Sequence, residues 1–427
     1  MTIFITLFLI VLFLGMPIAF AMGVPSLAYI FASGNSTIMA IIPQKIFGGL
    51  NSFTLLAVPF FLFAGEIMAT CGITDRLAKL CDLLVGRLRG GLAYVNVLNS
   101  TIFAGISGSA ITDIMSMGAL EIRMMKDQGY PEDFATACTV SSSVVGPIIP
   151  PSIMAAMYSG ITGCSMGALF AAGYIPGILM SLAMCAVIFY QSRKHNFPKR
   201  VVKYSAKEVR KILIDGIAAV LMPVIMIGGI LLGVFTPTEA AIVGVVYAII
   251  VGLVFLRTLK RRDFPRMLKN TAKNSCALLL LLGVAYLFGW VLTYENISGS
   301  LAAAITSFTQ SPTVFLLLVA ALALFAGMWM EVGTIVIIFA PILYPVAMSL
   351  GISAIHFGIV LILCAALGVT TPPVGVCLYA ASSIAGISAE RTFRRVWPFL
   401  VAQIVAIIVM ICLPELVLWL PRLSGFI

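Results

Sequence analysis

Two interruptions in otherwise apolar sequence constrain this chain more than any other feature. The first, Phe103–Asp113, reads FAGISGSAITD, and the second, Ser141–Ser152, reads SSSVVGPIIPPS. In hydrocarbon every backbone N–H and C=O needs a partner, so non-helical backbone survives only where it is buried in protein or lines a cavity. Interruptions rich in glycine, serine and proline therefore indicate a binding site inside a membrane protein.

The same pair of interruptions returns in the second half of the chain. Phe325–Gly333 (FAGMWMEVG) matches the first, and Leu367–Gly375 (LGVTTPPVG) matches the second. An offset of 222 residues, without a gap, aligns Gly105, Gly129, Gly146, Pro150, Pro151 and Pro176 with Gly327, Gly351, Gly368, Pro372, Pro373 and Pro398. Paired, interrupted apolar segments in two halves are the strongest sequence indication of the binding site of a secondary transporter.

Composition places the whole chain in a membrane. Of its 427 residues, 61% are hydrophobic and 10% are charged, and apolar runs long enough to span a bilayer recur from end to end. The net charge of +10 comes from Lys and Arg in a few short loops, which is typical of cytoplasmic loops and does not indicate nucleic-acid binding. Nine scattered cysteines and two histidines, with no HExxH or P-loop motif, give no support to a disulfide scaffold, a metalloprotease or an ATPase.

The distribution of basic residues predicts two re-entrant hairpins that open on opposite faces. Residues 91–104 and 110–126 are each short for a bilayer crossing and have basic flanks, so they form a hairpin from the cytoplasm with its tip at Gly105–Ser109. A long stretch around the second hairpin, 312–350 with its tip at Gly327–Gly333, contains no Lys or Arg. This hairpin is predicted to open on the outside, so the two halves form an inverted repeat.

The sequence thus predicts an all-α polytopic membrane protein with an inverted repeat, two re-entrant hairpins and two broken helices. The broken helices are 131–165, interrupted at Gly146–Pro151, and 354–386, interrupted at Gly368–Pro373. The predicted parts are a scaffold of 1–90, 166–311 and 391–427, the last a C-terminal span, and a transport domain of 91–165 and 312–390.

Within the scaffold, residues 1–33 and 214–256 are each predicted to form two short helices joined by a tight turn. The basic segment 203–211 is predicted to lie as an interfacial helix. Loops 76–89, 193–211 and 257–273 are predicted to be cytoplasmic, and 295–311 to lie outside. The side of the N-terminus stays open, since no charge marks it.

Two sets of oxygen atoms at the interruptions indicate sites for a small hard cation. Hydroxyls and unwound backbone carbonyls are the ligands that hold Na⁺ in such transporters. A single motif of small residues is explained by close helix packing, but paired, symmetry-related interruptions favour binding. The first predicted Na⁺ site comprises Ser107, Ser109, Gly146, Ile149 and Pro150, and the second comprises Gly327, Gly368, Thr371 and Pro372. Two sets indicate at least two Na⁺ per cycle.

An anionic solute is predicted beside these cations. Helices restart after each interruption with their N-termini pointing inward, and helix N-termini attract anions. Ionisable residues at membrane depth are rare, so Asp113 and Glu331 are candidates for touching the solute, balancing a cation, carrying a proton or capping a helix. The predicted substrate-binding residues are Ser107, Ser109, Thr112, Asp113, Ser152, Glu331, Gly333 and Thr370. Glu239, beside Pro237, is predicted instead to cap a scaffold helix.

Taken together, the motifs resemble those of one transporter family. Gly105–Asp113, Gly146–Ser152, Phe235–Ala241 (FTPTEAA) and Thr370–Gly375 (TTPPVG) resemble the large membrane subunit of TRAP (tripartite ATP-independent periplasmic) transporters. The resemblance covers nearly the whole chain and is greatest to the sialic-acid branch. It implies an elevator mechanism, coupling to Na⁺, and a location in the bacterial inner membrane. It also implies two partners, a small four-helix membrane subunit and a periplasmic substrate-binding protein.

The predicted function is Na⁺-coupled uptake of an organic acid, either sialic acid or a C4-dicarboxylate or other carboxylate. No enzymatic activity and no organic cofactor are expected. One alternative is a proton-coupled organic-anion transporter that uses Asp113. A channel would require a continuous polar pore lining, and the sequence offers isolated interruptions instead. An intramembrane enzyme would require a His/Cys ligand set or a nucleophile–base pair, neither of which the sequence contains.

Overall fold

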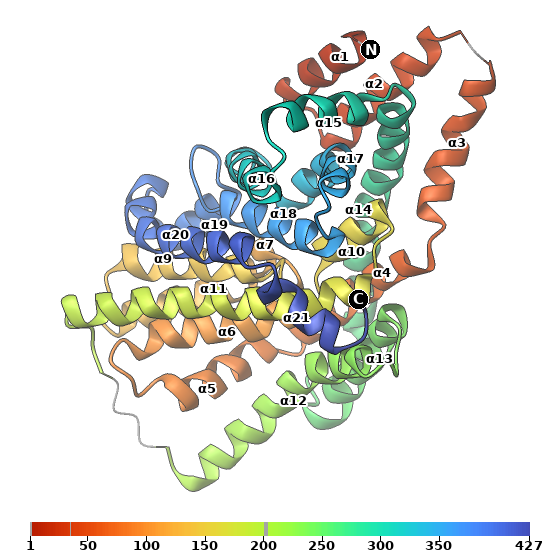
Figure 1. The fold of residues 1–427 in the computed structure, drawn as a ribbon. Coiled ribbons are helices and arrows are strands. Elements are labelled where there is room, and N and C mark those ends of the chain that lie inside the picture. Colours follow the sequence, from red (N-terminus) through yellow and green to blue (C-terminus); the bar gives the residue numbers. More distant parts are fainter. Residues whose placement is uncertain (1, 35, 200–203) are drawn as a thin grey trace.

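The computed structural model describes residues 2–34, 36–199 and 204–427, and within these ranges the chain forms helices and no named β-strand. Seven of the described helices are long and apolar enough to cross a membrane, judged by length and composition. Others are apolar but only 10–17 residues long. Figure 1 shows that four of these shorter helices, α10, α16, α18 and α19, belong to the hairpins and broken helices, whereas α2 and α3 lie at the upper right edge.

Both predicted hairpins are confirmed. Hairpin 1 (residues 91–127) consists of α6 (Gly91–Ser107), α7 (Ala110–Asp113), a π-helical turn (Ile114–Gly118) and α8 (Ala119–Asp127). Hairpin 2 (residues 312–349) consists of α16 (Pro312–Gly327) and α17 (Val332–Ser349). The chain reverses in hairpin 1 at Gly108, whose φ of 63° lies in the left-handed region that favours glycine. The tips are shorter than predicted, because helix continues to Ser107 and to Gly327.

Both predicted broken helices are also confirmed. Broken helix 1 (residues 132–162) consists of α9 (Glu132–Ser142), a 3₁₀ turn (Ser143–Val145) and α10 (Ile153–Thr162). Broken helix 2 (residues 354–385) consists of α18 (Ala354–Gly368) and α19 (Val376–Ala385). The Pro150–Pro151 and Pro372–Pro373 peptide bonds are cis. The prolines end each first segment because they donate no backbone N–H. Every residue from Ile355 to Gly368 is buried, so α18 lies at the centre of the molecule.

The structural repeat extends one helix further than the interruptions. The two long helices α11 (Met166–Lys194) and α20 (Ala389–Cys412) follow the broken helices, and each contains one of the aligned prolines, Pro176 and Pro398. Gly129 and Gly351, also aligned, both have positive φ where a hairpin leads into a broken helix. The two long helices pack against each other, and α20 also packs on α9. Each repeat is therefore a hairpin, a broken helix and a long helix.

Seven of the remaining described helices form a second group of packed helices, which Figure 1 shows on the right and below. Within this group α13 packs on α4 and α12, and α14 packs on α2, α3 and α4. Their bounds are α1 (Thr2–Phe13), α2 (Ile18–Ala32), α3 (Ser36–Leu50), α4 (Ala57–Thr70), α12 (Ala206–Leu231), α13 (Pro237–Ile250) and α14 (Phe264–Tyr294). Glu239 caps α13 as predicted: its carboxylate accepts the backbone N–H of Thr236 at 2.8 Å, in a capping box.

Several boundary predictions were wrong. The basic segment before residue 211 is not a separate interfacial helix, since α12 is continuous for 26 residues and starts at a Ser205–Glu208 capping box; residue 203 lies outside the described residues. The two helices predicted for 214–256 are present as α12 and α13, joined by a turn at 232–236, but the first begins eight residues earlier than predicted, at Ala206. The C-terminal span also divides, because Pro414 separates α20 from α21 (Glu415–Leu423). Two further helices, α5 (Ile73–Val85) and α15 (Ile297–Phe308), occupy much of the predicted loops 76–89 and 295–311.

The sidedness of the loops is testable by cysteine labelling. In a background in which the exposed Cys276 and Cys412 are replaced by serine, Lys207→Cys should react with an impermeant maleimide only after the cytoplasmic side is opened. Gln310→Cys should react from the periplasmic side of intact cells, because the second hairpin is predicted to open outward. Labelling of position 207 from the periplasm would contradict the inverted repeat.

Candidate functional site

The tips of both hairpins and the interruptions of both broken helices line the same cavity, which has a volume of about 140 Å³. Its polar wall includes Ser109 from hairpin 1 and Glu331 from hairpin 2, and its apolar wall includes Pro147, Met154 and Val369 from the broken helices. Two sequence segments more than 200 residues apart are thus brought to one place. The repeated interruptions build one shared site, as expected for the binding site of a two-fold repeat.

The first half of the site forms where hairpin 1 meets broken helix 1. A Cβ on Gly146 would lie 3.0 Å from the carbonyl oxygen of Ser109, and a Cβ on Gly105 would lie 3.3 Å from that of Pro150. Ser107 lies between Gly105 and Ser109 in the sequence, and its hydroxyl is buried and has no hydrogen-bond partner in the described structure. A buried polar group without a partner costs about 1–3 kcal/mol. A cation bound there would offset this cost, so these oxygens fit Na⁺.

The second half forms where hairpin 2 meets broken helix 2. A Cβ on Gly327 would lie 2.6 Å from the Cα of Gly368, so the two backbones touch and leave no room for a side chain. The Met328 carbonyl accepts the backbone N–H of Gly375 at 3.1 Å, which anchors the tip to the interruption. The Thr371 hydroxyl donates to the Gly368 carbonyl at 2.6 Å. It keeps its own lone pairs, so it can still ligate a cation.

Two of the predicted substrate-binding residues, Ser109 and Glu331, line the cavity. Ser107, Thr112 and Asp113 are not among the residues that line it. Thr112 is exposed beyond the tip, whereas Asp113 is 2% exposed and turned into the interior of hairpin 1. The residue at which α7 starts determines which of its side chains face the interior, because successive residues on a helix point in directions about 100° apart.

The other three predicted substrate-binding residues have structural contacts of their own. Ser152 caps α10: its hydroxyl accepts the backbone N–H of Ala155 at 3.1 Å and donates to the carbonyl of Pro147. The Thr370 hydroxyl donates to the carbonyl one turn before it, at 2.7 Å. Gly333 lies inside α17, where a Cβ would sit 3.5 Å from the sulfur of Met154. None of the three lines the cavity.

A buried polar network behind the first tip was missed in the sequence. The Asn96 amide donates to the Thr139 hydroxyl at 2.7 Å, and the Ser142 hydroxyl donates to the Asn96 carbonyl oxygen at 2.7 Å. Ser100 joins the chain by donating to Ser142 at 3.0 Å. The spacing of its residues is a signal in the sequence, because Asn96 and Ser100 are four apart on α6, Thr139 and Ser142 are three apart on α9, and such pairs share one helix face. The network fixes hairpin 1 against broken helix 1.

The same region holds two buried acidic residues, Asp113 and Glu121, and the second half of the chain has no acidic residue at the aligned positions. Glu121 accepts a hydrogen bond from the Asn99 amide at 2.7 Å and, like Asp113, is nearly fully buried. Neither carboxylate forms an ion pair with a described Lys or Arg, and each has one oxygen without a hydrogen-bond partner in the described structure. The aligned positions in the second half are Ile335 and Leu343. Acidic side chains are therefore concentrated behind the first tip.

Volume limits what the cavity can hold. Pockets for small organic molecules typically measure about 300–1,000 Å³, more than twice the 140 Å³ found here. The space suits small cations with a few waters, and a solute the size of a sugar acid requires the tips to separate. Glu331 is the only charged residue among the described ones that line it, so attraction for an anion must come from cations and helix N-termini.

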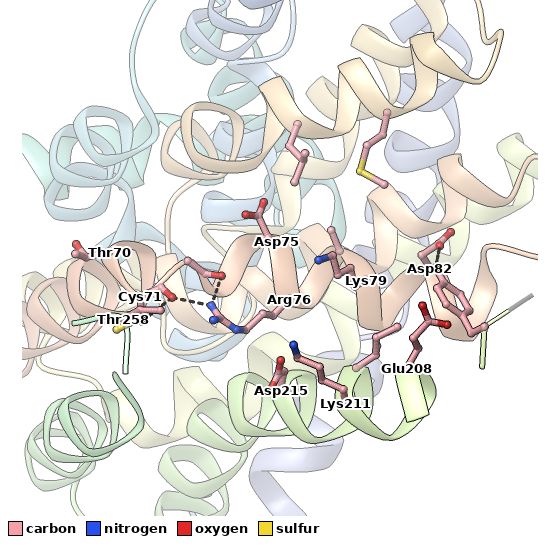
Figure 2. Close-up of a pocket in the computed structure, with 16 residues that line it drawn as sticks. Thr70, Cys71, Asp75, Arg76, Lys79, Asp82, Glu208, Lys211, Asp215 and Thr258 are labelled. Atoms are coloured by element: carbon pink, nitrogen blue, oxygen red, sulfur yellow. Dashed lines mark hydrogen bonds between the residues drawn. The ribbon is translucent and has the colours of Figure 1, made fainter. Parts of the chain in front are cut away.

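A larger cavity, of about 760 Å³, lies away from the hairpin tips between α5, α8 and α12. Figure 2 shows Arg76 on the side of α5 nearer to Lys211 and Asp215 of α12, whereas Asp75 points to the other side of α5. None of the residues predicted from the sequence to bind solute or Na⁺ lines this cavity. Its mixture of acidic and basic side chains selects neither sign of charge, so the smaller cavity is the candidate site.

Comparison with known proteins agrees with this geometry. Residues 5–416 match the family described as "Tripartite ATP-independent periplasmic transporter, DctM component". The chain is 38% identical over 412 residues to the sialic acid TRAP transporter large permease protein SiaM of Vibrio cholerae, covering 96% of each chain. It is 37% identical over 400 residues to the C4-dicarboxylate TRAP transporter large permease protein DctM of Pseudomonas aeruginosa, covering 92% of this chain and 93% of that one.

One solved structure shares the fold. The crystal structure of the Alcanivorax borkumensis YdaH transporter, described as having an unusual topology, superimposes with a TM-score of 0.62 over 92% of this chain and 89% of that chain. The sequence identity is 15%, so the similarity concerns the fold alone.

Proposed function

The chain belongs to the DctM family of tripartite ATP-independent periplasmic transporters, and on this premise we propose that it couples uptake of an organic acid to Na⁺. The observation that carries the proposal is the cavity shared by two hairpin tips and two interruptions. Isolated unwound segments around one small cavity suit a carrier that binds and releases its solute. A channel would need a continuous polar pathway instead.

Sodium is proposed to bind in two symmetry-related places. At the first, the unpartnered Ser107 hydroxyl lies beside the contact between the hairpin 1 tip and the Gly146–Pro150 interruption. At the second, the Thr371 hydroxyl and the unwound backbone near Gly327 and Gly368 supply oxygens. Neutral hydroxyls and carbonyls suit a small hard cation. Two bound Na⁺ would supply the positive charge that an anionic solute requires beside Glu331.

The proposed solute is a sialic acid, with C4-dicarboxylates as the second candidate. Relatives of nearly equal identity carry names for each of these solutes. Both are carboxylates, and the N-termini of α10 and α19 begin at the interruptions where they can face a carboxylate. The solute would contact Ser109 and Glu331, the polar residues that hairpin 1 and hairpin 2 contribute to the cavity.

The proposed movement is an elevator in which both repeats move as one body. The predicted moving parts, 91–165 and 312–390, contact each other through α10 with α17 and α18. The packing of α11 and α20 on these parts supports including both long helices in the moving body. The group formed by α1–α4 and α12–α14 would be the scaffold.

The proposed assembly includes a small membrane subunit and a periplasmic binding protein, in a bacterial inner membrane. This follows from the family, whose name states that the transporter is tripartite and periplasmic. A separate binding protein would capture dilute solute on the outer face and deliver it to the cavity.

Uptake by purified components in liposomes tests the function. Uptake of one acid from a panel should saturate, require an inward Na⁺ gradient, and stop when either partner protein is omitted. Flux proportional to solute concentration without saturation would favour a channel. Efficient uptake by this chain alone would contradict the tripartite assembly. Uptake driven by a proton gradient in Na⁺-free buffer, and lost in Asp113→Asn, would favour the proton-coupled alternative.

A further inference from the structure

A third cavity, of about 490 Å³, lies between the C-terminal end of α11 and the N-terminal end of α20. These two long helices belong to different repeats and pack side by side (Figure 1). Their basic residues meet here although they are 200 positions apart in the sequence: Lys194 and His195 come from α11 and its cap, and Arg394 and Arg395 from α20. No acidic side chain is among the described residues that line the cavity.

The positive charge of this cavity is only partly neutralised. Arg394 pairs with Glu390 at 2.8 Å, but both side chains are more than three-quarters exposed, so the pair holds them weakly. Arg395 donates its Nε–H to Asp133 at 3.1 Å, which fixes the arginine at the cavity wall. The Lys194 ammonium lies 5.8 Å from the centre of the Tyr190 ring, which also faces the cavity. The cavity therefore suits a ligand with negative charge.

Polarity changes along the cavity in the direction of the helix axes. On α11 the lining passes from Ala186 and Val187 through Tyr190 to Lys194. On α20 it passes in the same direction from Pro398 to Arg395. The cavity thus has an apolar end, an aromatic middle and a basic end. A phospholipid in one leaflet of a bilayer has the matching order of acyl chain, glycerol and phosphate. A free anion would need the basic end alone.

The surroundings place this cavity at a membrane surface. Tyr190 and Trp397 are more than half exposed and lie about one helical turn from Lys194 and Arg394, and aromatic residues are enriched at the membrane–water interface. Below them α11 and α20 present exposed apolar side chains, including Leu182 and Val405. The loop after α11 is predicted to be cytoplasmic, so the basic end faces the cytoplasmic leaflet.

We propose that this cavity binds the phosphate of an anionic phospholipid of the cytoplasmic leaflet. Basic pockets between membrane helices on the cytoplasmic side are known to hold such headgroups. Lys194 and Arg394 contact the phosphate, while the acyl chains follow the apolar groove past Val187 and Pro398. The lipid thus joins the two repeats at their long helices. The proposal does not depend on the identity of the transported solute or coupling ion.

Lipid retention by the purified full chain tests the proposal. The chain is placed in nanodiscs of equal parts phosphatidylglycerol and phosphatidylcholine, released, and examined by native mass spectrometry for retained lipid. Each basic residue near a lipid surface contributes about 1 kcal/mol, so Lys194→Gln with Arg394→Gln should weaken phosphatidylglycerol retention roughly 30-fold. Phosphatidylcholine retention should not change. Both residues are exposed, so the folded structure should persist.

Arg193→Gln is the matched control. Arg193 is adjacent to Lys194 but stacks over Phe189, with its guanidinium carbon 4.0 Å from the ring centre, and does not line the cavity. This variant should retain phosphatidylglycerol like the parent chain. The proposal is overturned if the double variant retains as much phosphatidylglycerol as the parent, or if Arg193→Gln loses as much as the double variant. It is also overturned if inorganic phosphate displaces the lipid at concentrations comparable to those of the lipid itself, since the site would then bind a free anion.

Discussion

Gly327→Ala should lower the rate of uptake in reconstituted liposomes by at least about an order of magnitude. The reason is steric. A Cβ at Gly327 would lie 2.6 Å from the Cα of Gly368, and backbone cannot rotate away as a side chain can. Separating the two segments by the width of a methyl group costs about 1–3 kcal/mol in a packed core. That displacement falls on the oxygens proposed to hold the second Na⁺.

Gly228→Ala provides the matched control, because a Cβ at Gly228 in α12 would have no atom within 4 Å. It should transport like the parent chain. The thermal midpoint of each variant should be measured in parallel, so that lost transport is separated from lost folding. A Gly327→Ala variant that transports normally would show that the tip of hairpin 2 does not touch broken helix 2 during transport.

The second large effect is expected for the hydroxyls of the proposed Na⁺ sites. Ser107→Ala and Thr371→Ala should each raise the Na⁺ concentration for half-maximal uptake by about tenfold, since a hydrogen bond or ligand contact to a charged group contributes about 1.5–3 kcal/mol. The maximal rate at saturating Na⁺ should change less, because the backbone carbonyls remain. The measurement is initial uptake rate against external Na⁺ at constant pH and ionic strength.

Ser349→Ala serves as the control for Thr371→Ala. Its hydroxyl makes the same kind of bond, to the carbonyl three residues earlier at 2.8 Å, but at the far end of α17. It should leave the Na⁺ dependence unchanged. An unchanged Na⁺ dependence in both Ser107→Ala and Thr371→Ala would remove these hydroxyls from the Na⁺ sites.

The hairpins and broken helices were predictable because glycine and proline act locally. A proline removes a donor wherever it stands, so Pro150 and Pro372 mark the interruptions without any tertiary information. The boundaries of α12 and α20 were not predictable in this way. A basic, amphipathic start such as Ala206–Lys211 resembles a surface helix, and only packing on α5 shows that it continues into the membrane.

The candidate site was predictable at the level of segments, and less so at the level of side chains. Ser109 and Glu331 line the cavity, but Asp113 faces the polar network behind the tip. Whether a residue after a tip faces the cavity depends on where the new helix begins, which the sequence alone does not determine to one residue. The spacing of polar residues indicates a polar face on α6 and on α9, but it does not show that these two faces pack together through Asn96 and Ser142.

The short helices after the interruptions have an electrical consequence. α10 and α19 contain ten residues each, so each spans only about 15 Å, half of the roughly 30 Å of hydrocarbon. The cavity lies at their inner ends, so the Na⁺ ions proposed to bind there would lie within the part of the membrane across which the voltage falls. Two Na⁺ moving with a monocarboxylate carry one net charge, to which 100 mV contributes about 2.3 kcal/mol. The same two Na⁺ moving with a dicarboxylate carry none, so the current recorded during uptake depends on which acid is transported.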